Sequence, residues 1–137
     1  MQKQAFKKLN YCTYALQYHL VIVTKYRNKC LSAAMLEQLR TICDKQMVLK
    51  GGALLEFNGE EDHIHLLIEL PPKVALSAAV NSLKTVTARL LRRDHGPALK
   101  KHYWTPVLWS RSYFVASCGG APLSVIKQYI QQQAAPH

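Results

Sequence analysis

The centre of the chain carries the stretch His63-Ile64-His65-Leu66-Leu67-Ile68-Glu69-Leu70. This nearly continuous apolar run predicts a buried strand, and Pro71-Pro72 closes it because proline lacks the backbone donor that a sheet needs. Side chains two residues apart on a strand point to the same face. His63 and His65 are therefore expected side by side, with Ile64 buried between them.

The segments on either side predict the remaining strands. Residues 53–57 form a short apolar strand, and Asn58-Gly59 is a strong turn signal. The acidic residues Glu60-Glu61-Asp62 follow, so residues 53–70 are expected to form an antiparallel hairpin with a widened loop. An earlier apolar run at residues 14–24 and a later one at residues 108–118 predict two further strands.

Helical periodicity fills the intervals between these strands. Ser32 is a plausible cap for a helix that ends before Gly51-Gly52. A second helix is expected from about residue 75 to residue 93, ended by Gly96-Pro97. After the break at Gly119-Gly120, a last helix is expected at about residues 122–133, with Pro122 in its first turn. Leu123, Ile126 and Ile130 are expected to pack that helix, which leaves Tyr129 on another face.

The order strand, helix, strand, strand, helix, strand, helix predicts an α+β fold. It is the ferredoxin-like or RRM-like pattern: a four-stranded antiparallel sheet with two helices on one face, plus a C-terminal helix carrying Tyr129. Short connections predict a single domain over residues 1–137. This fold alone names no function, because RNA binders and small enzymes share it.

The charge balance of the chain points to a polyanionic partner. The 137 residues include 18 Lys and Arg against 8 Asp and Glu, a formal net charge of +10. Such a surplus on a small domain favours nucleic acid, although a basic protein without such a partner is the alternative. The residues proposed for DNA contact, from charge and position, are Lys25, Arg27, Lys84, Arg89, Arg92 and Arg111. For each charged run, a solvated surface is the competing interpretation.

The cysteines and the N-terminal residues predict a cytoplasmic protein. The four cysteines show no Cys-x-x-Cys spacing, so a zinc knuckle is unsupported and reduced thiols are expected. No long apolar segment follows the charged start, so neither a signal peptide nor a membrane span is expected.

Two residue pairs could carry chemistry. His63 and His65 present two neighbouring imidazoles, which suit a divalent cation; two solvent-facing histidines are the alternative. Tyr129 and Gln133 stand four residues apart on the last helix and so share a face. A tyrosine hydroxyl can attack phosphorus, and an amide oxygen can bind Mg²⁺ or Mn²⁺. An interfacial tyrosine beside a polar helix end is the alternative.

Together and in this order, the two pairs resemble the HUH endonucleases. Within that group the sequence is most similar to the single-tyrosine transposases, the TnpA-type transposases of small bacterial insertion sequences. The resemblance covers nearly the whole chain. Its blocks are Asp62-His63-Ile64-His65-Leu66-Leu67-Ile68, Trp109-Ser110-Arg111-Ser112-Tyr113-Phe114, Gly119-Gly120-Ala121-Pro122 and Ile126-Lys127-Gln128-Tyr129-Ile130, with an early segment from Tyr18-His19-Leu20-Val21 to Thr24-Lys25-Tyr26-Arg27.

The resemblance implies an activity and a site. His63, His65 and Gln133 would hold Mg²⁺ or Mn²⁺, and Tyr129 would be the nucleophile. The protein would cleave and rejoin single-stranded DNA at insertion-sequence ends through a 5′-phosphotyrosine, recognising hairpin ends. It would be a homodimer whose last helix crosses at Gly119-Gly120 to the partner's histidines. One of Glu60, Glu61 and Asp62 could orient an imidazole.

Three other functions fit parts of the same sequence. A non-catalytic RRM-like module that binds RNA or single-stranded DNA suits the fold and the charge, but it predicts aromatic residues where His63 and His65 stand. A domesticated repeat-associated tyrosine transposase would keep the same chemistry in a chromosomal role. A metallohydrolase that activates water would have no use for Tyr129.

Overall fold

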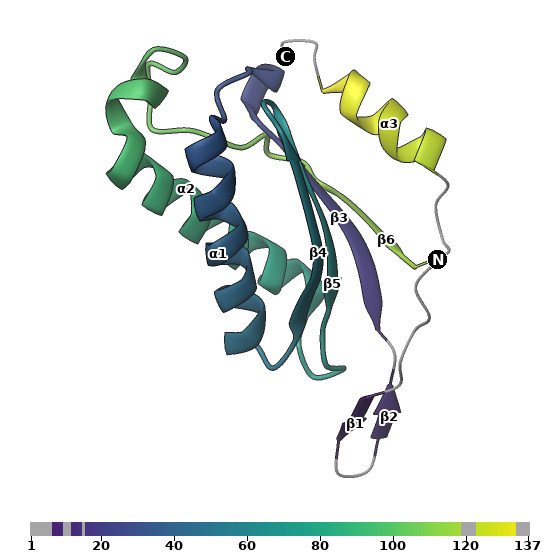
Figure 1. The fold of residues 1–137 in the computed structure, drawn as a ribbon. Helices are drawn as coiled ribbons and strands as arrows, with labels where there is room; N and C mark the ends of the chain where they lie inside the picture. The colour runs from purple at the N-terminus through teal and green to yellow at the C-terminus, as the bar shows by residue number, and fades with distance from the viewer. Residues whose placement is uncertain (1–6, 10–11, 15, 119–122, 134–137) are drawn as a thin grey trace.

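A four-stranded antiparallel sheet organises the molecule (Figure 1). The computed structural model describes residues 7–9, 12–14, 16–118 and 123–133. The strands lie in the order β4 (Ala53–Glu60), β5 (His63–Glu69), β3 (Gln17–Val23) and β6 (Phe114–Ser117). The two central strands, β3 and β5, pair along their full lengths, from Gln17 opposite Glu69 to Val23 opposite His63. This arrangement confirms the predicted α+β fold.

The two faces of the sheet are covered by different helices. Figure 1 shows α1 (Ala33–Leu49) and α2 (Leu76–Lys100) on one side and α3 (Leu123–Gln132) on the other. The main core lies under α1 and α2, where Leu20, Ile22 and Ile64 are fully buried. Alternate residues of the same strands point the other way, and Val21 and Val23 lie in a separate cluster that α3 covers. The period of two along a strand therefore separates a packing face from a second face.

The first helix forms as expected from its sequence. The Ser32 side chain accepts a hydrogen bond from the backbone N–H of Met35 at 3.2 Å, which caps the N-terminus of α1. The buried stripe of α1 consists of Met35, Leu39, Ile42, Cys43 and Met47. Burial raises the pKa of the Cys43 thiol to about 12, so this cysteine is a packing residue.

The turn predicted at Asn58-Gly59 is wrong. Both residues lie inside β4, opposite His65 and Ile64, and the chain reverses instead at Glu61-Asp62. Gly59 lies close to α1: a Cβ there would stand 2.5 Å from Cδ2 of Leu36, so a larger residue would require this side chain to shift. A glycine in a strand can mark the close approach of a neighbouring element as well as a turn. The hairpin is therefore tighter than expected, which places Asp62 directly before the histidine pair.

The second helix is longer than predicted. It runs to Lys100 and contains Pro97, with a local break at His95, whose φ and ψ are −131° and 28°. Pro97 follows this break, where a new helical turn begins and a missing N–H is tolerated. The His95 ring nitrogen Nε2 lies 2.8 Å from Oε1 of Gln38 on α1. Gly96-Pro97 thus interrupts the helix without ending it.

The last strand is shorter than predicted. Of residues 108–118 only Phe114–Ser117 form β6, and Trp109 makes a single bridge to Thr24. The Lys84 ammonium donates to the carbonyl oxygens of Ser110 and Arg111 at 2.8 and 2.9 Å. Ser110 still donates its N–H to the carbonyl oxygen of Val23 at 2.7 Å, but regular pairing with β3 begins only at Phe114.

A short hairpin precedes the sheet and was not predicted. It consists of β1 (Lys7–Leu9) and β2 (Cys12–Tyr14), and the run predicted at residues 14–24 is divided between β2 and β3. The expected break at Gly119-Gly120 and the expected position of Pro122 lie outside the described residues. Among the residues that are described, no helix is long and apolar enough to cross a membrane.

The connection from α1 to β4 requires a glycine at position 52. A Cβ there would lie 2.1 Å from the carbonyl oxygen of Glu69, a backbone atom that cannot rotate away. We expect Gly52→Ala to lower the free energy of unfolding by roughly 1–3 kcal/mol, measured from urea unfolding curves. Gly96→Ala is the matched control, because nothing lies within 4 Å of its Cβ position. Equal unfolding midpoints for the two variants would contradict this account.

Candidate functional site

The histidine pair lies on the sheet face that α3 covers. In β5, Ile64 and Leu66 point into the main core, whereas His63 and His65 point to the opposite face. His63 is opposite Val23 and His65 is opposite Val21, the two valines of the cluster under α3. The structure thus confirms that the imidazoles share a face with a buried isoleucine between them.

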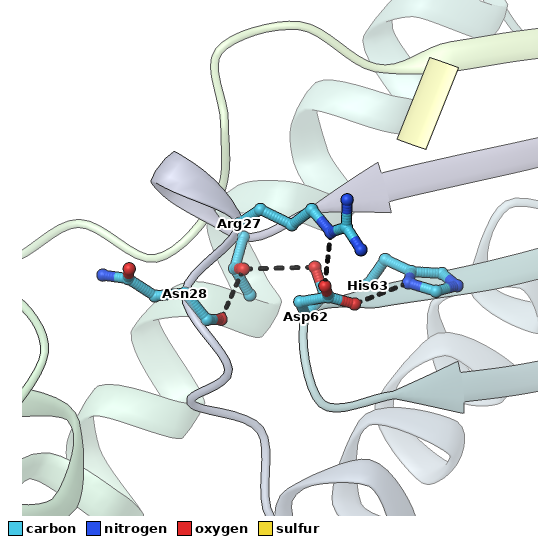
Figure 2. A network of polar contacts seen from close by, with 5 residues as sticks. Arg27, Asn28, Asp62 and His63 are labelled. Atoms are coloured by element: carbon cyan, nitrogen blue, oxygen red, sulfur yellow. Dashed lines mark hydrogen bonds and ion pairs between the residues drawn. The ribbon is translucent and has the colours of Figure 1, made fainter. Parts of the chain in front are cut away.

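Asp62 orients the first of these imidazoles. Its Oδ1 lies 2.8 Å from Nδ1 of His63, and its Oδ2 accepts from Nε of Arg27 at 2.6 Å (Figure 2). The Thr24 hydroxyl donates to the Asp62 carbonyl oxygen at 3.1 Å, which holds the turn. Since a carboxylate only accepts, the proton in this contact belongs to Nδ1 of His63, which leaves Nε2 as the nitrogen that could bind a metal. Of the three acidic residues, Asp62 is the one that contacts an imidazole.

The charge on Asp62 is kept despite its burial. The side chain is 8% exposed. Burial alone would raise its pKa, but the hydrogen bonds from Arg27 and His63 outweigh burial and leave the pKa below the ordinary carboxyl value. Asp62 therefore stays ionised through the neutral range. The stabilisation from the Arg27–Asp62 ion pair is present above the ordinary carboxyl pKa. It is lost as the pH falls through the lowered pKa of Asp62.

His65 is held in its neutral form. Its Nε2 lies 3.2 Å from Nδ1 of His19 on β3, so one proton is shared between the two rings. The pKa of His65 is lowered, first by burial and then by the neighbouring His19 and His63. A neutral imidazole is the form that binds a metal. His19 was not singled out from the sequence, because only the pairing of β3 with β5 brings it to His65.

Tyr129 and Gln133 meet the same serine. The Tyr129 hydroxyl lies 2.9 Å from Oγ of Ser112. Gln133 Oε1 accepts from Ser112 Oγ at 3.3 Å and from Ser110 Oγ at 3.0 Å. The predicted four-residue spacing therefore does bring both side chains to residues 110–112, although α3 ends at Gln132, one residue before Gln133. Neither serine was assigned a role from the sequence, although both lie in the block at residues 109–114.

Tyr129 also packs, contrary to the sequence expectation. Its ring centroid lies 5.5 Å from that of Phe114, and it contacts the Val21 and Val23 cluster together with Ile130. The expectation failed because Phe114 and the valines form an apolar platform that no helix periodicity reveals. Burial raises the pKa of the Tyr129 hydroxyl, with a smaller opposing effect from Ser112. The hydroxyl is therefore protonated at neutral pH.

The side chains that could hold a metal come from two elements. Within the described ranges, no three His, Cys, Asp or Glu residues are grouped to hold an ion. The candidate donors are the two imidazoles of β5 and the amide oxygen of Gln133. Two imidazole nitrogens, one of them oriented by a carboxylate, and one amide oxygen can bind a divalent ion; the oxygen is a donor suited to Mg²⁺ or Mn²⁺, whereas imidazoles also suit ions such as Zn²⁺. Gln133 would have to exchange its two serine hydroxyls for the metal.

The residues that were predicted to contact DNA do not form one surface. Lys25 and Arg111 line a cavity of about 400 Å³ together with Tyr26, Ser110, Ser112 and Gln133. Arg27 is paired with Asp62, and Lys84 holds the backbone of residues 110 and 111. Arg89 is exposed, and Arg92 lines a smaller cavity of about 180 Å³ near the exposed Trp104. Only Lys25 and Arg111 border the cavity that contains Gln133.

The chain is similar to known proteins over most of its length. Residues 12–133 match the family model described as "Transposase IS200 like". The chain is 30% identical over 120 residues to the ISDra2 transposase TnpA of Deinococcus radiodurans, covering 88% of this chain and 85% of that protein. It is 31% identical over 127 residues to the transposase for insertion sequence element IS200 of Salmonella typhimurium, covering 93% and 82%.

Two solved structures share the fold. A transposase from Deinococcus radiodurans R1 superposes with a TM-score of 0.82 at 31% identity, covering 94% of this chain and 98% of that one. A REP-associated tyrosine transposase bound to a REP hairpin superposes with a TM-score of 0.56 at 11% identity, covering 90% and 67%. The second likeness shows the fold alone.

Proposed function

Since the chain belongs to the IS200-like transposase family, we propose that it cleaves and rejoins single-stranded DNA with Tyr129 as a covalent nucleophile. The observation that carries this proposal is the meeting of Tyr129 and Gln133 at Ser112, on the sheet face that bears His63 and His65. The RRM-like module considered from the sequence is not favoured, because the family match covers residues 12–133 and the face carries histidines.

The covalent step follows from the chemistry of a phenol hydroxyl. The Tyr129 oxygen forms a bond to the scissile phosphorus, and the bond from phosphorus to the 3′ oxygen breaks. The phenol loses its proton to solvent, and the departing 3′ oxygen takes one up. The products are a 5′-phosphotyrosine and a free 3′-hydroxyl. A 3′-hydroxyl of another strand can reverse the step and regenerate Tyr129, which is strand transfer without an external energy source.

The surroundings of Tyr129 position the hydroxyl for this step. The ring is clamped against Phe114 and the valine cluster, and the Ser112 hydroxyl directs the oxygen. His63, His65 and Gln133 are the residues that would hold Mg²⁺ or Mn²⁺. When bound, such an ion neutralises charge on the phosphate and favours the ionised phenol. The raised pKa of Tyr129 makes this help necessary at neutral pH.

The DNA partner of this site is a single strand with hairpin ends. Lys25 and Arg111 are proposed to contact phosphates near the cleavage point, and this is supported by their lining the same cavity as Gln133. Arg89 and Arg92 on α2 are proposed to contact the flanking hairpin. Arg27 and Lys84 act indirectly, because each is engaged within the protein by Asp62 or by the backbone of residues 110 and 111.

We propose that residues 1–137 act as one domain and that two copies form a homodimer. In the structure α3 covers the sheet of its own chain, so Tyr129 lies on the face of its own histidine pair. Exchange of α3 between subunits would place the same contacts across the interface. Mixing Tyr129→Phe with His63→Ala subunits distinguishes the two arrangements, because activity recovers in mixed dimers only when one site combines residues of both chains.

Adduct formation tests the proposed function directly. Single-stranded DNA from the sequence flanking the gene, labelled at its 3′ end, is incubated with the protein and Mg²⁺ or Mn²⁺, and the products are separated on a denaturing protein gel. A labelled band at the mass of the protein plus DNA, lost with EDTA, is the expected result. Cleavage without any such band would mean hydrolysis by water and would overturn the proposal.

Asp62 is proposed to act as a positioning residue for His63. Asp62→Asn keeps the shape of the side chain but removes the charge that pairs with Arg27 and fixes the proton on His63. We expect the affinity for Mn²⁺, followed by the EPR signal of the free ion, to fall roughly 10- to 100-fold. The control is Asp94→Asn, which removes an exposed ion pair with Arg93 and should leave Mn²⁺ affinity unchanged. Unaltered Mn²⁺ affinity in a folded Asp62→Asn protein would remove this role.

A further inference from the structure

Two consecutive residues beside the candidate site adopt a rare backbone conformation. In η1 (Lys25–Arg27), Tyr26 has φ 60° and Arg27 has φ 55°, both in the left-handed region that favours glycine. Such conformations persist only where the surrounding structure imposes them, and they cluster at functional sites. Neither residue is glycine, asparagine or aspartate. The strained backbone at Tyr26 and Arg27 must therefore be maintained by contacts that hold their side chains in place.

The corner at Tyr26 is held from several sides. The Lys25 N–H donates to the carbonyl oxygen of Leu108 at 2.8 Å, and the Tyr103 hydroxyl donates to the carbonyl oxygen of Lys25 at 2.8 Å. The Arg27 side chain is bonded to Asp62, which is bonded in turn to His63 (Figure 2). The position of Tyr26 is consequently tied to the position of the histidine pair.

The side chain at this corner is exposed rather than packed into the core. Tyr26 is 43% exposed and borders the cavity of about 400 Å³ with Lys25, Arg111 and Gln133. The Lys25 ammonium lies 5.6 Å from the centre of the Tyr26 ring. An exposed aromatic ring beside Lys25, in a cavity that Arg111 also lines, matches an unpaired nucleobase and its flanking phosphates, because the ring offers stacking and the cations offer charge.

We propose that Tyr26 is the platform on which an unpaired nucleobase next to the scissile phosphate stacks, with Lys25 and Arg111 on the adjoining phosphates. This inference rests on the proposed function and adds a residue that positions the strand. Gln133 borders the same cavity and shares Ser112 with Tyr129, so a base held at Tyr26 lies beside the phosphate that Tyr129 attacks. Stacking is tolerant of sequence, so Tyr26 sets the path of the strand more than the identity of the base.

Stacking at Tyr26 is measured in EDTA, where no reaction occurs. Single-stranded oligonucleotides from the DNA flanking the gene carry 2-aminopurine at successive positions, and stacking quenches its fluorescence. We expect quenching at a position adjoining the cleavage point. Tyr26→Ala should abolish the quenching and weaken binding roughly 5- to 100-fold. Tyr26→Trp should retain both.

Two further variants separate stacking from folding and from general surface effects. Tyr26→Gly relieves the left-handed strain, so it should lose the quenching without a lowered melting temperature. Trp104→Ala removes another exposed aromatic residue beside cations, Arg92 and Lys100, and should leave the quenching at this position intact. Undiminished quenching in Tyr26→Ala, equal loss in Trp104→Ala, or no quenching at any position would overturn the proposal.

The outcome is independent of the test for the covalent step. An adduct formed with the metal present, without quenching that depends on Tyr26, would overturn the stacking platform and leave the transferase intact. Quenching that depends on Tyr26, without any adduct, would support the platform and overturn the tyrosine chemistry.

Discussion

Replacing Tyr129 by phenylalanine is expected to abolish the covalent protein–DNA adduct and to leave the fold and DNA binding largely unchanged. Phenylalanine has no oxygen to attack phosphorus, so adduct formation should fall by at least roughly 10³-fold, as for the loss of an essential nucleophile. The ring of Tyr129 packs against Phe114 and the valine cluster, and a phenylalanine ring preserves these contacts. Only the hydrogen bond with Ser112 is lost.

The neighbouring Tyr113 supplies a matched control. Its ring lies 5.7 Å from the Lys84 ammonium, a contact that Tyr113→Phe retains. We expect Tyr113→Phe to form adducts at close to the wild-type rate on the same labelled strand. An adduct that persists in Tyr129→Phe would assign the nucleophile to another residue. Cleavage that persists without an adduct would assign it to water.

Removal of the His63 and His65 imidazoles should reduce adduct formation about as much as Tyr129→Phe does, but through loss of the metal site. The double variant His63→Ala, His65→Ala removes two of the three proposed donors. The double variant should lose more Mn²⁺ affinity than the roughly 10- to 100-fold expected for Asp62→Asn, because Asp62 only orients a proposed metal ligand. Adduct formation should be lost as well, because no bound metal ion would then polarise the scissile phosphate or favour the ionised phenol. Calorimetric titration with Mn²⁺ measures the first effect and the labelled gel the second.

His102→Ala is the control for this experiment. His102 is exposed in the loop after α2, and its backbone N–H donates to the carbonyl oxygen of Leu99, a contact that alanine keeps. Its Mn²⁺ affinity and adduct yield should equal those of the wild type. An adduct that survives both EDTA and the double variant would show that the covalent step needs no metal at these histidines.

Several features could be read from the sequence because local patterns carry them. The period of two in His63-Ile64-His65 places the imidazoles on one face and Ile64 in the core. Ser32 caps α1 as its position before the apolar stripe predicts. The spacing from Tyr129 to Gln133 brings both side chains to Ser112. The order of elements and the blocks of resemblance identified the fold and the family.

Other features were predicted wrongly, because contacts with residues far away in the sequence changed the structure that the local pattern predicts. Asn58-Gly59 has the composition of a turn, yet Gly59 lies in β4 because Leu36 of α1 approaches it closely. Pro97 was expected to follow a helix end, but it sits after a single irregular residue at His95, whose ring contacts Gln38. The apolar run at residues 108–118 forms a strand only over Phe114–Ser117, and Lys84 binds the carbonyl groups of residues 110 and 111, just before that strand.

The sequence by itself determined the alternation, the caps and the residue types, because each depends on neighbours within a few positions along the chain. Tertiary structure alone decided that Asp62 orients His63, that His19 meets His65, and that Tyr26 is held in a left-handed conformation beside Gln133. The physical reason is that these positions depend on partners far apart in sequence: Arg27, which holds the Asp62 carboxylate, is 35 positions away from it, and His19 is 46 positions away from His65. The geometry of these contacts is set by the register of the strands and by the packing of α3 on β3. Periodicity in the sequence indicates which face of a helix or strand is buried, but it does not indicate which residue covers that face.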